Sequence, residues 1–316
     1  MIKKDIWLVG TGYMAVEYAK VLNALGVTYI TIGRQTKNCE SFSAATGAKP
    51  IPGGLMGYLQ TRPSIPECAI VTVGIEALSQ VTAQLLEYGV KYILLEKPGV
   101  GEAAEIYPLT ELAREKKAKI LLAYNRRFYA SVLAAKNIIA EDGGVTSFQF
   151  EFTEWSHTIR PLVKHPTEHH NWFLGNSTHV IDTAFYLGGI PRELCAYVKG
   201  GMDWHPASSV FSGAGITENG ALFSYSANWE APGRWVVEML TKKHRLIFKP
   251  MEALQIQKIG SVAIEPVAIE DALDKEFKPG IYLQTKTFLE GDDSQFCDIY
   301  KQQEMIDRFY KKMSGY

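Results

Sequence analysis

Lys97 is the first residue in this sequence whose setting indicates chemistry. It lies in Glu96-Lys97-Pro98, directly after the apolar run Tyr92–Leu95. Far upstream, the segment Gly10-Thr11-Gly12-Tyr13-Met14-Ala15 follows the apolar run Ile6–Val9 and fits the GxGxxA pattern of a dinucleotide-binding turn. Either signal alone is weak. Together, at the ends of two expected strands, they place a lysine where the nicotinamide end of a dinucleotide would lie.

The GxGxxA turn predicts a pyrophosphate site. Gly10 allows a tight turn after the strand, and Gly12 lets backbone amides approach the pyrophosphate because no Cβ stands in the way. Ala15 allows the following helix to pack closely, and the N-terminus of that helix supplies partial positive charge. The alternative is an ordinary strand–helix turn whose glycines serve geometry alone.

Arg34 bears on which dinucleotide is bound. NAD enzymes carry an acidic residue near the end of the second strand, where it binds the ribose hydroxyls. Here the sequence reads Thr31-Ile32-Gly33-Arg34-Gln35, with no carboxylate. Because a guanidinium suits a 2′-phosphate, NADP(H) is favoured over NAD(H). The alternative is a solvated arginine in a surface loop.

Two further segments carry candidate functional side chains. In Asn176-Ser177-Thr178-His179-Val180-Ile181-Asp182, the spacing puts His179 and Asp182 on one helix face, and histidine titrates near neutrality. In Asn125-Arg126-Arg127-Phe128, either arginine is suited to an anionic or hydroxyl-rich substrate. The alternatives are a histidine satisfied within the core and arginines in salt bridges between domains.

These segments resemble the motifs of the glucose–fructose oxidoreductase, inositol dehydrogenase and MocA family (Gfo/Idh/MocA), and the resemblance covers nearly the whole chain. It implies an NAD(P)-dependent oxidoreductase that transfers hydride between nicotinamide C4 and a hydroxyl-bearing carbon of a sugar, nucleotide sugar or cyclitol. Lys97 and His179 would be the catalytic proton-transfer pair. Family members form dimers or tetramers through the second sheet, so a homodimer or homotetramer is expected.

The resemblance also implies two sets of site residues. The expected cofactor-binding residues are Gly10, Thr11, Gly12, Tyr13, Met14, Arg34, Val73, Glu96 and Lys97. The expected substrate-binding residues are Lys97, Arg126, Asn176, His179 and Asp182.

The chain departs from the family pattern at one position. The family segment reads D-x-G-x-H-x-x-D, and its first aspartate falls on Gly175, with Asn176 and Ser177 as the nearest polar substitutes. An amide cannot take a proton as a carboxylate can, so a three-member relay is in doubt. The rival interpretation is therefore a non-catalytic dinucleotide-binding sensor of the same fold. Retention of both Lys97 and His179 speaks for an enzyme.

Composition excludes several other classes. The 316 residues carry 33 Lys and Arg against 34 Asp and Glu, so the net charge of −1 gives no reason to expect nucleic acid or an anionic membrane as partner. No apolar run approaches the ~18 residues of a membrane span. Four scattered cysteines without a CxxC pair are expected to be free thiols in the cytoplasm. The spacing of His157, His165, His169 and His170 matches no metal pattern, so no metal is expected.

The arrangement of expected elements predicts two α/β domains. Residues 1–124 alternate continuous apolar strands with helices, which indicates a doubly wound parallel sheet, although the segment Asn38–Pro66 could not be assigned. Residues 125–316 form the second, α+β domain. Within Val145–Trp155, Phe148, Phe150 and Phe152 alternate with polar residues, which predicts an open, mostly antiparallel sheet. A final helix is expected over Cys297–Met313.

Overall fold

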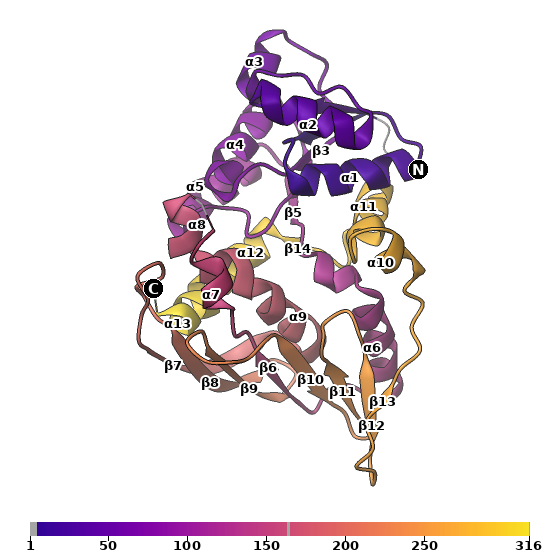
Figure 1. Ribbon diagram of the computed structural model, residues 1–316, viewed down its shortest axis with the longest axis vertical. Coiled ribbons are helices and arrows are strands. Elements are labelled where there is room, and N and C mark those ends of the chain that lie inside the picture. Colours follow the sequence, from indigo (N-terminus) through magenta and orange to yellow (C-terminus); the bar gives the residue numbers. More distant parts are fainter. Residues whose placement is uncertain (1–4, 163–164, 316) are drawn as a thin grey trace. The chain divides into compact units, whose positions relative to one another are not determined.

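The computed structural model describes residues 5–162 and 165–315, and the chain divides into two units (Figure 1). The first contains residues up to Asn125 together with Leu273–Gln303, and the second contains Arg126–Ala272 with the residues from Glu304 onward. The domain boundary predicted at residue 124 is next to Asn125, where the chain first passes from the first unit to the second. In contrast, the segment Leu273–Gln303, which was expected in the second domain, belongs to the first unit.

The first unit is built around a six-stranded sheet, sheet A, in the order β14-β5-β4-β3-β1-β2. All neighbouring strands are parallel except β14, which pairs antiparallel with β5. The predicted doubly wound parallel sheet is therefore confirmed. Its strands are β1 (Ile6–Val9), β2 (Tyr29–Ile32), β3 (Cys68–Val71), β4 (Tyr92–Leu95), β5 (Lys119–Leu122) and β14 (Cys297–Asp298).

The order of these strands creates a switch point between β1 and β3. The chain leaves β1 to reach β2 on one side and then returns to β3 on the other side. In open α/β sheets, ligands bind at the carboxyl ends of the strands at such a point, because the following loops diverge there. Sheet A therefore places the loops after β1, β2 and β3 around one position.

Helices flank sheet A, and their apolar faces explain their positions. In α1 (Tyr13–Ala24), the buried residues Ala15, Tyr18, Ala19 and Leu22 recur at helical spacing. This helix packs against α11 (Ile281–Glu290), which comes from the returning C-terminal segment (Figure 1). The remaining helices of this unit are α2 (Thr36–Thr46), α3 (Gly54–Gln60), η1 (Ile75–Ala77), α4 (Leu78–Tyr88), η2 (Ala103–Glu105) and α5 (Ile106–Glu115).

The segment Asn38–Pro66, which could not be assigned from the sequence, is occupied by helices α2 and α3. In α2, only Cys39 and Phe42 are buried, so its apolar pattern is short. Between the helices, Ile51 forms an isolated parallel bridge with Ile32 at the end of β2. This segment therefore extends the wall beside the switch point.

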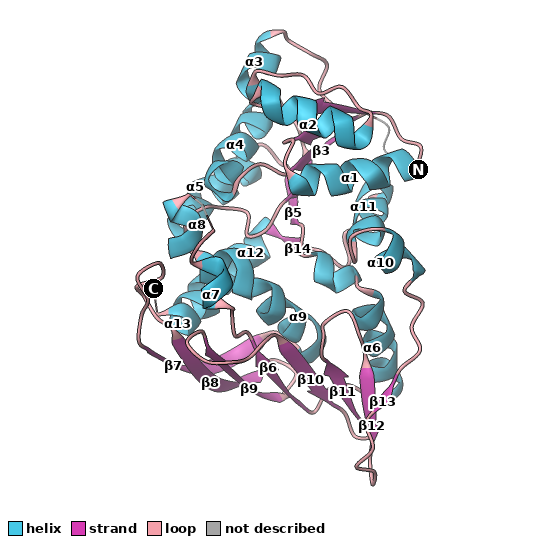
Figure 2. Cartoon of the chain, viewed as in Figure 1, coloured by secondary structure: helices cyan, strands magenta, loops and turns pink. Residues whose placement is uncertain are grey.

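The second unit contains an eight-stranded sheet, sheet B, in the order β13-β12-β11-β10-β6-β9-β8-β7, drawn as magenta arrows in Figure 2. All pairs are antiparallel except β6 with β9, so the predicted mostly antiparallel sheet is confirmed. Its strands are β6 (Ser147–Glu151), β7 (Pro191–Lys199), β8 (Val210–Thr217), β9 (Leu222–Asn228), β10 (Val236–Leu240), β11 (His244–Phe248), β12 (Gln255–Lys258) and β13 (Glu265–Pro266).

The alternating phenylalanines of β6 anchor this sheet. Phe148 and Phe150 are buried, whereas Gln149 between them is exposed. Phe148 stacks on Phe223 at 5.3 Å, and Phe150 contacts Phe185 of α9 at 5.5 Å between ring centroids. The period-2 pattern thus decides which face of sheet B is covered by α9 (Thr178–Gly188).

The other helices of the second unit include a π-helical turn, η4 (Phe173–Ser177), directly before α9. The rest are α6 (Ala130–Glu141), α7 (Ser156–Ile159), α8 (Pro166–His170), η5 (Ile306–Tyr310) and α13 (Lys311–Ser314). The expected single helix over Cys297–Met313 is instead β14 followed by α12 (Ile299–Met305), the π-helical η5 and α13. The short helices η3 (Asn125–Phe128), α10 (Ala272–Glu276) and α12 span the three points at which the chain passes from one unit to the other.

Within the described ranges, no helix has the length and apolar character needed to cross a membrane. None of the four cysteines, all of which are described, forms a disulfide: Cys39, Cys68 and Cys297 are buried, and Cys195 is exposed.

Candidate dinucleotide and substrate site

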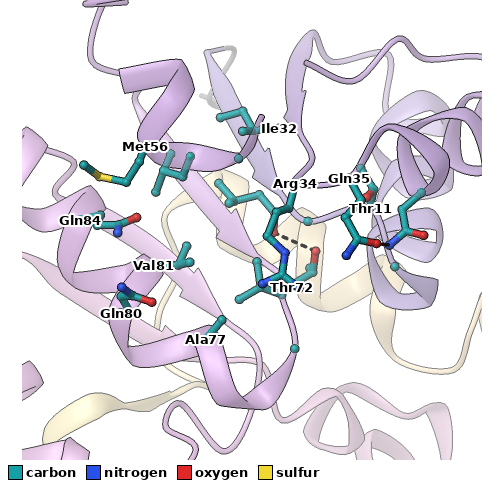
Figure 3. Close-up of a pocket in the computed structure, with 18 of the residues that line it drawn as sticks. Thr11, Ile32, Arg34, Gln35, Met56, Thr72, Ala77, Gln80, Val81 and Gln84 are labelled. Carbon is teal, nitrogen blue, oxygen red and sulfur yellow. Dashed lines mark hydrogen bonds between the residues drawn. The ribbon is translucent and has the colours of Figure 1, made fainter. Parts of the chain in front are cut away.

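A cavity of about 380 Å³ opens at the switch point of sheet A (Figure 3). The loops after β1, β2 and β3 line it, with α3 and α4 completing the wall. Of the nine residues expected to bind cofactor, five line it: Gly10, Thr11, Gly12, Arg34 and Val73. The remaining four, Tyr13, Met14, Glu96 and Lys97, are not among its lining residues.

The two glycines of the first loop act differently. Gly10 has φ +125°, and a Cβ there would lie 2.4 Å from Oγ1 of Thr72, so this position excludes a side chain. At Gly12, a Cβ would meet no atom within 4 Å, because this residue faces open space at the start of α1. Among the residues that the structure describes, no side chain caps that helix N-terminus. The first amides of α1 are therefore available to a pyrophosphate, which fits a dinucleotide.

Arg34 follows β2 and lines the cavity, as the sequence predicted. In Figure 3 it extends on one side of the cavity, while Ala77, Gln80, Val81 and Gln84 line another wall. Across residues 5–162 and 165–315, Arg34 makes no salt bridge. Glu76 is the one carboxylate among the described residues that line the cavity.

Several lining residues escaped sequence analysis. Gly53, Gly54 and Met56 come from the segment that could not be assigned, and Glu76 and Gln80 come from the turn into α4. The signal that could have found the second group is its position directly after the apolar strand β3, at the same sheet edge as the GxGxxA turn.

Three separate elements hold the Glu96-Lys97-Pro98 turn. The Glu96 amide donates to the Val71 carbonyl of β3 at 3.0 Å. The side-chain amide of Gln302, in α12, donates from Nε2 to the Pro98 carbonyl at 3.0 Å. The hydroxyl of Tyr18, in α1, donates to Glu96 at 3.1 Å. Lys97, which is half-buried, therefore follows β4 on a turn whose backbone is fixed from both sides.

Glu96 is half-buried, and the burial of its carboxyl raises its pKa, with the neighbouring Lys97 and Tyr18 acting in the opposite direction. Burial, together with Glu96, also raises the pKa of Tyr18 well above its ordinary value. The Tyr18 oxygen lies 2.9 Å from the Gln284 side-chain amide as well. A hydroxyl carries one proton, so Tyr18 can donate to only one of these two partners, Glu96 or Gln284. If Tyr18 donates to Glu96, Gln284 can donate to the Tyr18 oxygen through Nε2, an atom that is otherwise buried without an acceptor.

In the second unit, His179 lies on the first turn of α9 and is 9% exposed. Its ring centroid is 6.4 Å from that of Trp235. Its carbonyl accepts from the Thr183 hydroxyl at 2.8 Å. Lys97 belongs to the first unit and His179 to the second, so their convergence stays a prediction.

Asp182 and Arg127 form a buried ion pair. Nε of Arg127 donates to Oδ2 of Asp182 at 2.8 Å, and Nη2 donates to Oδ1 at 2.6 Å. The side chains are 12% and 5% exposed, respectively. Both partners lie in the second unit, so this salt bridge is internal to that unit and not the link between domains considered for Arg127. Both carboxylate oxygens of Asp182 are engaged by Arg127.

Glu154, which sequence analysis did not select, occupies the place beside the altered motif. Its carboxylate accepts from Nδ2 of Asn176 at 3.0 and 3.1 Å and from Oγ of Ser177 at 2.9 Å. Glu154 is 1% exposed, and burial raises its pKa, while Ser177, Arg234 and Asn176 act to lower it. The two polar residues that replace the motif's acidic position are thus hydrogen-bonded to a carboxyl from beyond β6.

This chain is similar to known proteins in its fold. No protein-family model matches the sequence, and no curated protein matches it either. Solved structures do match. Levoglucosan dehydrogenase in complex with NADH and levoglucosan has a TM-score of 0.78 at 16% identity, covering 99% of this chain and 97% of that one.

Two other solved structures agree over similar lengths. UDP-N-acetylglucosamine 3-dehydrogenase from Acidithiobacillus ferrooxidans has a TM-score of 0.73 at 14% identity, covering 100% of this chain and 98% of that one. An oxidoreductase from Agrobacterium radiobacter in complex with NAD+, L-tartaric acid and magnesium has a TM-score of 0.73 at 12% identity, with coverages of 96% and 93%. This chain therefore has the fold of the Gfo/Idh/MocA-type oxidoreductases among these solved structures.

Proposed function

We propose that this protein is an NAD(P)-dependent oxidoreductase acting on a hydroxyl-bearing carbon of a sugar, nucleotide sugar or cyclitol. One observation carries the proposal. The cavity at the switch point is lined by Gly10 and Gly12, and Lys97 follows a neighbouring strand of the same sheet at the same edge. The solved structures of similar fold include enzymes of levoglucosan and of a UDP-sugar, which supports this class of substrate.

The roles proposed for the side chains follow from their chemistry. When bound, the nicotinamide donates or accepts the hydride. Lys97 would donate a hydrogen bond to the substrate oxygen and stabilise the charge that develops there, and His179 would exchange the proton. Arg126 and Asn176 are proposed substrate contacts. Asp182 would act through Arg127, because that guanidinium occupies both of its oxygens.

For the cofactor, we propose NADP(H) in preference to NAD(H). Arg34 lines the cavity without a salt bridge to any described residue, so its guanidinium is available to a 2′-phosphate. Glu76 supports the opposite choice, since a carboxylate in the same cavity is suited to ribose hydroxyls. Two of the compared structures contain NADH or NAD+. Measuring the affinities of the protein for NADPH and NADH therefore tests whether Arg34 or Glu76 sets the cofactor preference.

We also propose that copies of this chain associate through sheet B. On one face of its strands, Tyr197 and Leu222 expose 73% and 60% of their surface. Apolar side chains of this size on a sheet face are typical of an interface. Light scattering on the purified protein would test this, since a monomer at micromolar concentration contradicts it.

The test of the proposed activity is turnover of nicotinamide with a panel of sugars, sugar acids, nucleotide sugars and cyclitols. Lys97→Ala is expected to abolish turnover while changing the dissociation constant of the dinucleotide by less than about threefold, because its contribution is made in the transition state. Lys91→Ala is the matched control, since Lys91 precedes the same strand at its opposite end. Dinucleotide binding without turnover of any compound would favour the sensor.

A further inference from the structure

Two guanidinium groups share one tryptophan ring in the second unit. Cζ of Arg126 lies 4.6 Å from the centroid of Trp235, and Cζ of Arg234 lies 4.4 Å from it. The ring of His179 contacts the same tryptophan at 6.4 Å between centroids. All four residues belong to one unit, so their arrangement is internal to it. The proposed proton-transfer residue therefore lies beside a concentration of positive charge.

Arg126 has no carboxylate bonded to its guanidinium among the described residues. Its Nε is buried and has no hydrogen-bond acceptor, and it forms no salt bridge with the rest of the described chain. Burial lowers the pKa of Arg126, with Tyr129, Glu252 and Glu154 opposing this effect. The next residue, Arg127, shows the contrast, because Asp182 neutralises it completely. A buried guanidinium without an acceptor costs free energy that a bound anion would offset.

Arg234 is held in place but is not neutralised in the same way. It stacks on Trp155 at 4.6 Å as well as on Trp235, so its planar group is fixed between two indoles. It forms a salt bridge with Glu154 in which Nη1 lies 3.7 Å from Oε2, beyond hydrogen-bonding distance. The oxygens of Glu154 already accept from Asn176 and Ser177. Because the side chain of Arg234 is 43% exposed, a ligand can reach it.

We infer that Arg126 and Arg234, which both contact the Trp235 ring, form an oxyanion-binding subsite beside His179. The inference deepens the proposed function and rests on it. The substrate would carry a carboxylate or a phosphate in addition to the hydroxyl that is oxidised. Guanidinium groups bind both kinds of oxyanion through paired N–H donors.

The experiment uses the full-length protein with its dinucleotide bound. Isothermal titration with glucuronate, glucose 6-phosphate and glucose compares two anions with a neutral sugar of the same ring. At least one anion is expected to bind about tenfold or more tightly than glucose at low ionic strength, with the difference shrinking as salt is added. The stronger of the two anions identifies the carboxylate or the phosphate as the preferred group.

Variants assign the effect to the two arginines. Arg234→Gln, a change at a half-exposed position, is expected to lower affinity for the preferred anion about tenfold and leave glucose unchanged. Arg126→Gln should also lower affinity for the preferred anion, and Arg126→Lys supplies a second variant that retains the charge if the first does not fold. Arg192→Gln is the control, since this exposed arginine pairs only with the adjacent Glu193 among described residues.

The outcomes separate this inference from the proposed function. Equal binding of glucose and both anions, no binding of either anion, or unchanged anion affinity in Arg234→Gln overturns the subsite. Turnover of neutral sugars in that case leaves the oxidoreductase proposal standing. Conversely, Arg234-dependent anion binding without nicotinamide turnover on any compound supports the subsite and counts against the enzyme.

Discussion

The hydroxyl of Tyr18 donates a 3.1 Å hydrogen bond to Oε1 of Glu96, which joins the first helix to the turn that carries Lys97. Glu96 is half-buried, so this donor offsets part of the cost of its charge. The contact is made between residues 78 positions apart. It ties the geometry of the proposed catalytic lysine to the helix whose N-terminus faces the dinucleotide cavity.

Tyr18→Phe is expected to lower kcat while leaving dinucleotide affinity within about threefold. Without the hydroxyl, Glu96 would keep its proton to higher pH. The acid limb of the plot of kcat/KM against pH should therefore shift to higher pH. Tyr29→Phe is the matched control, because its hydroxyl bonds Asn23 at 3.0 Å on an exposed surface. An unchanged pH profile with intact folding would show that the contact does not position Lys97.

Arg34→Ala tests the cofactor preference. The unaltered protein is expected to bind NADPH more tightly than NADH, and the variant should lose about tenfold or more of NADPH affinity with little change for NADH. Glu76→Gln is the counterpart: a loss confined to NADH would assign the ribose hydroxyls to that carboxylate. Tighter binding of NADH by the unaltered protein contradicts the NADP(H) proposal.

His179→Ala is expected to lower the turnover rate by about 10²- to 10⁴-fold if the imidazole transfers the proton. His244→Ala serves as a control histidine, since its ring bonds Asp142 at 2.7 Å and lies apart from the His179–Trp235 contact. A His179 variant with full activity would identify His179 as a core residue. A crystal structure with cofactor and sugar would measure the predicted approach of Lys97 to His179.

The Arg127–Asp182 pair predicts a stability effect. Removing either partner alone leaves a buried charge, so Asp182→Asn or Arg127→Met should lower the free energy of unfolding by about 3–5 kcal/mol. Replacing both residues with apolar side chains is expected to restore most of that loss, because neither charge is then buried alone. Denaturant unfolding of the two single variants and the double variant measures the coupling. If the losses of unfolding free energy in the two single variants add up in the double variant, the interaction between Arg127 and Asp182 contributes little to stability.

Asp142 predicts how stability changes with pH. Burial raises the pKa of this carboxyl, but hydrogen bonds from Thr241, His244 and Lys243 outweigh burial and hold it below the ordinary value of 3.8. A lowered folded-state pKa contributes stability above the unfolded-state pKa, and that contribution is lost as pH falls through the folded-state value. Asp142→Asn should therefore cost about 2 kcal/mol near pH 7 and progressively less below pH ~4. A cost that is constant from pH 7 to pH 3 contradicts this assignment.

The sequence by itself determined the parts of this protein that rest on local patterns. Apolar runs of strand length after turn residues located all five parallel strands of sheet A, and the period-2 phenylalanines of β6 identified the covered face of sheet B. The GxGxxA turn identified the start of the cavity, since a tight turn and an open helix N-terminus depend on residues a few positions apart. Such features are encoded within one or two turns of chain, so they can be recognised without knowledge of the rest.

Only the tertiary structure decided the contacts that join distant segments. Gln302 reaches Pro98, Gln284 reaches Tyr18, and Glu154 reaches Asn176, each across a separation that leaves no periodic trace. The return of Leu273–Gln303 to the first unit was missed for the same reason, because its strand β14 has only two residues. The Arg126–Trp235–Arg234 cluster likewise joins η3 to the segment directly before β10, which is far away in the chain, so no local pattern could reveal it.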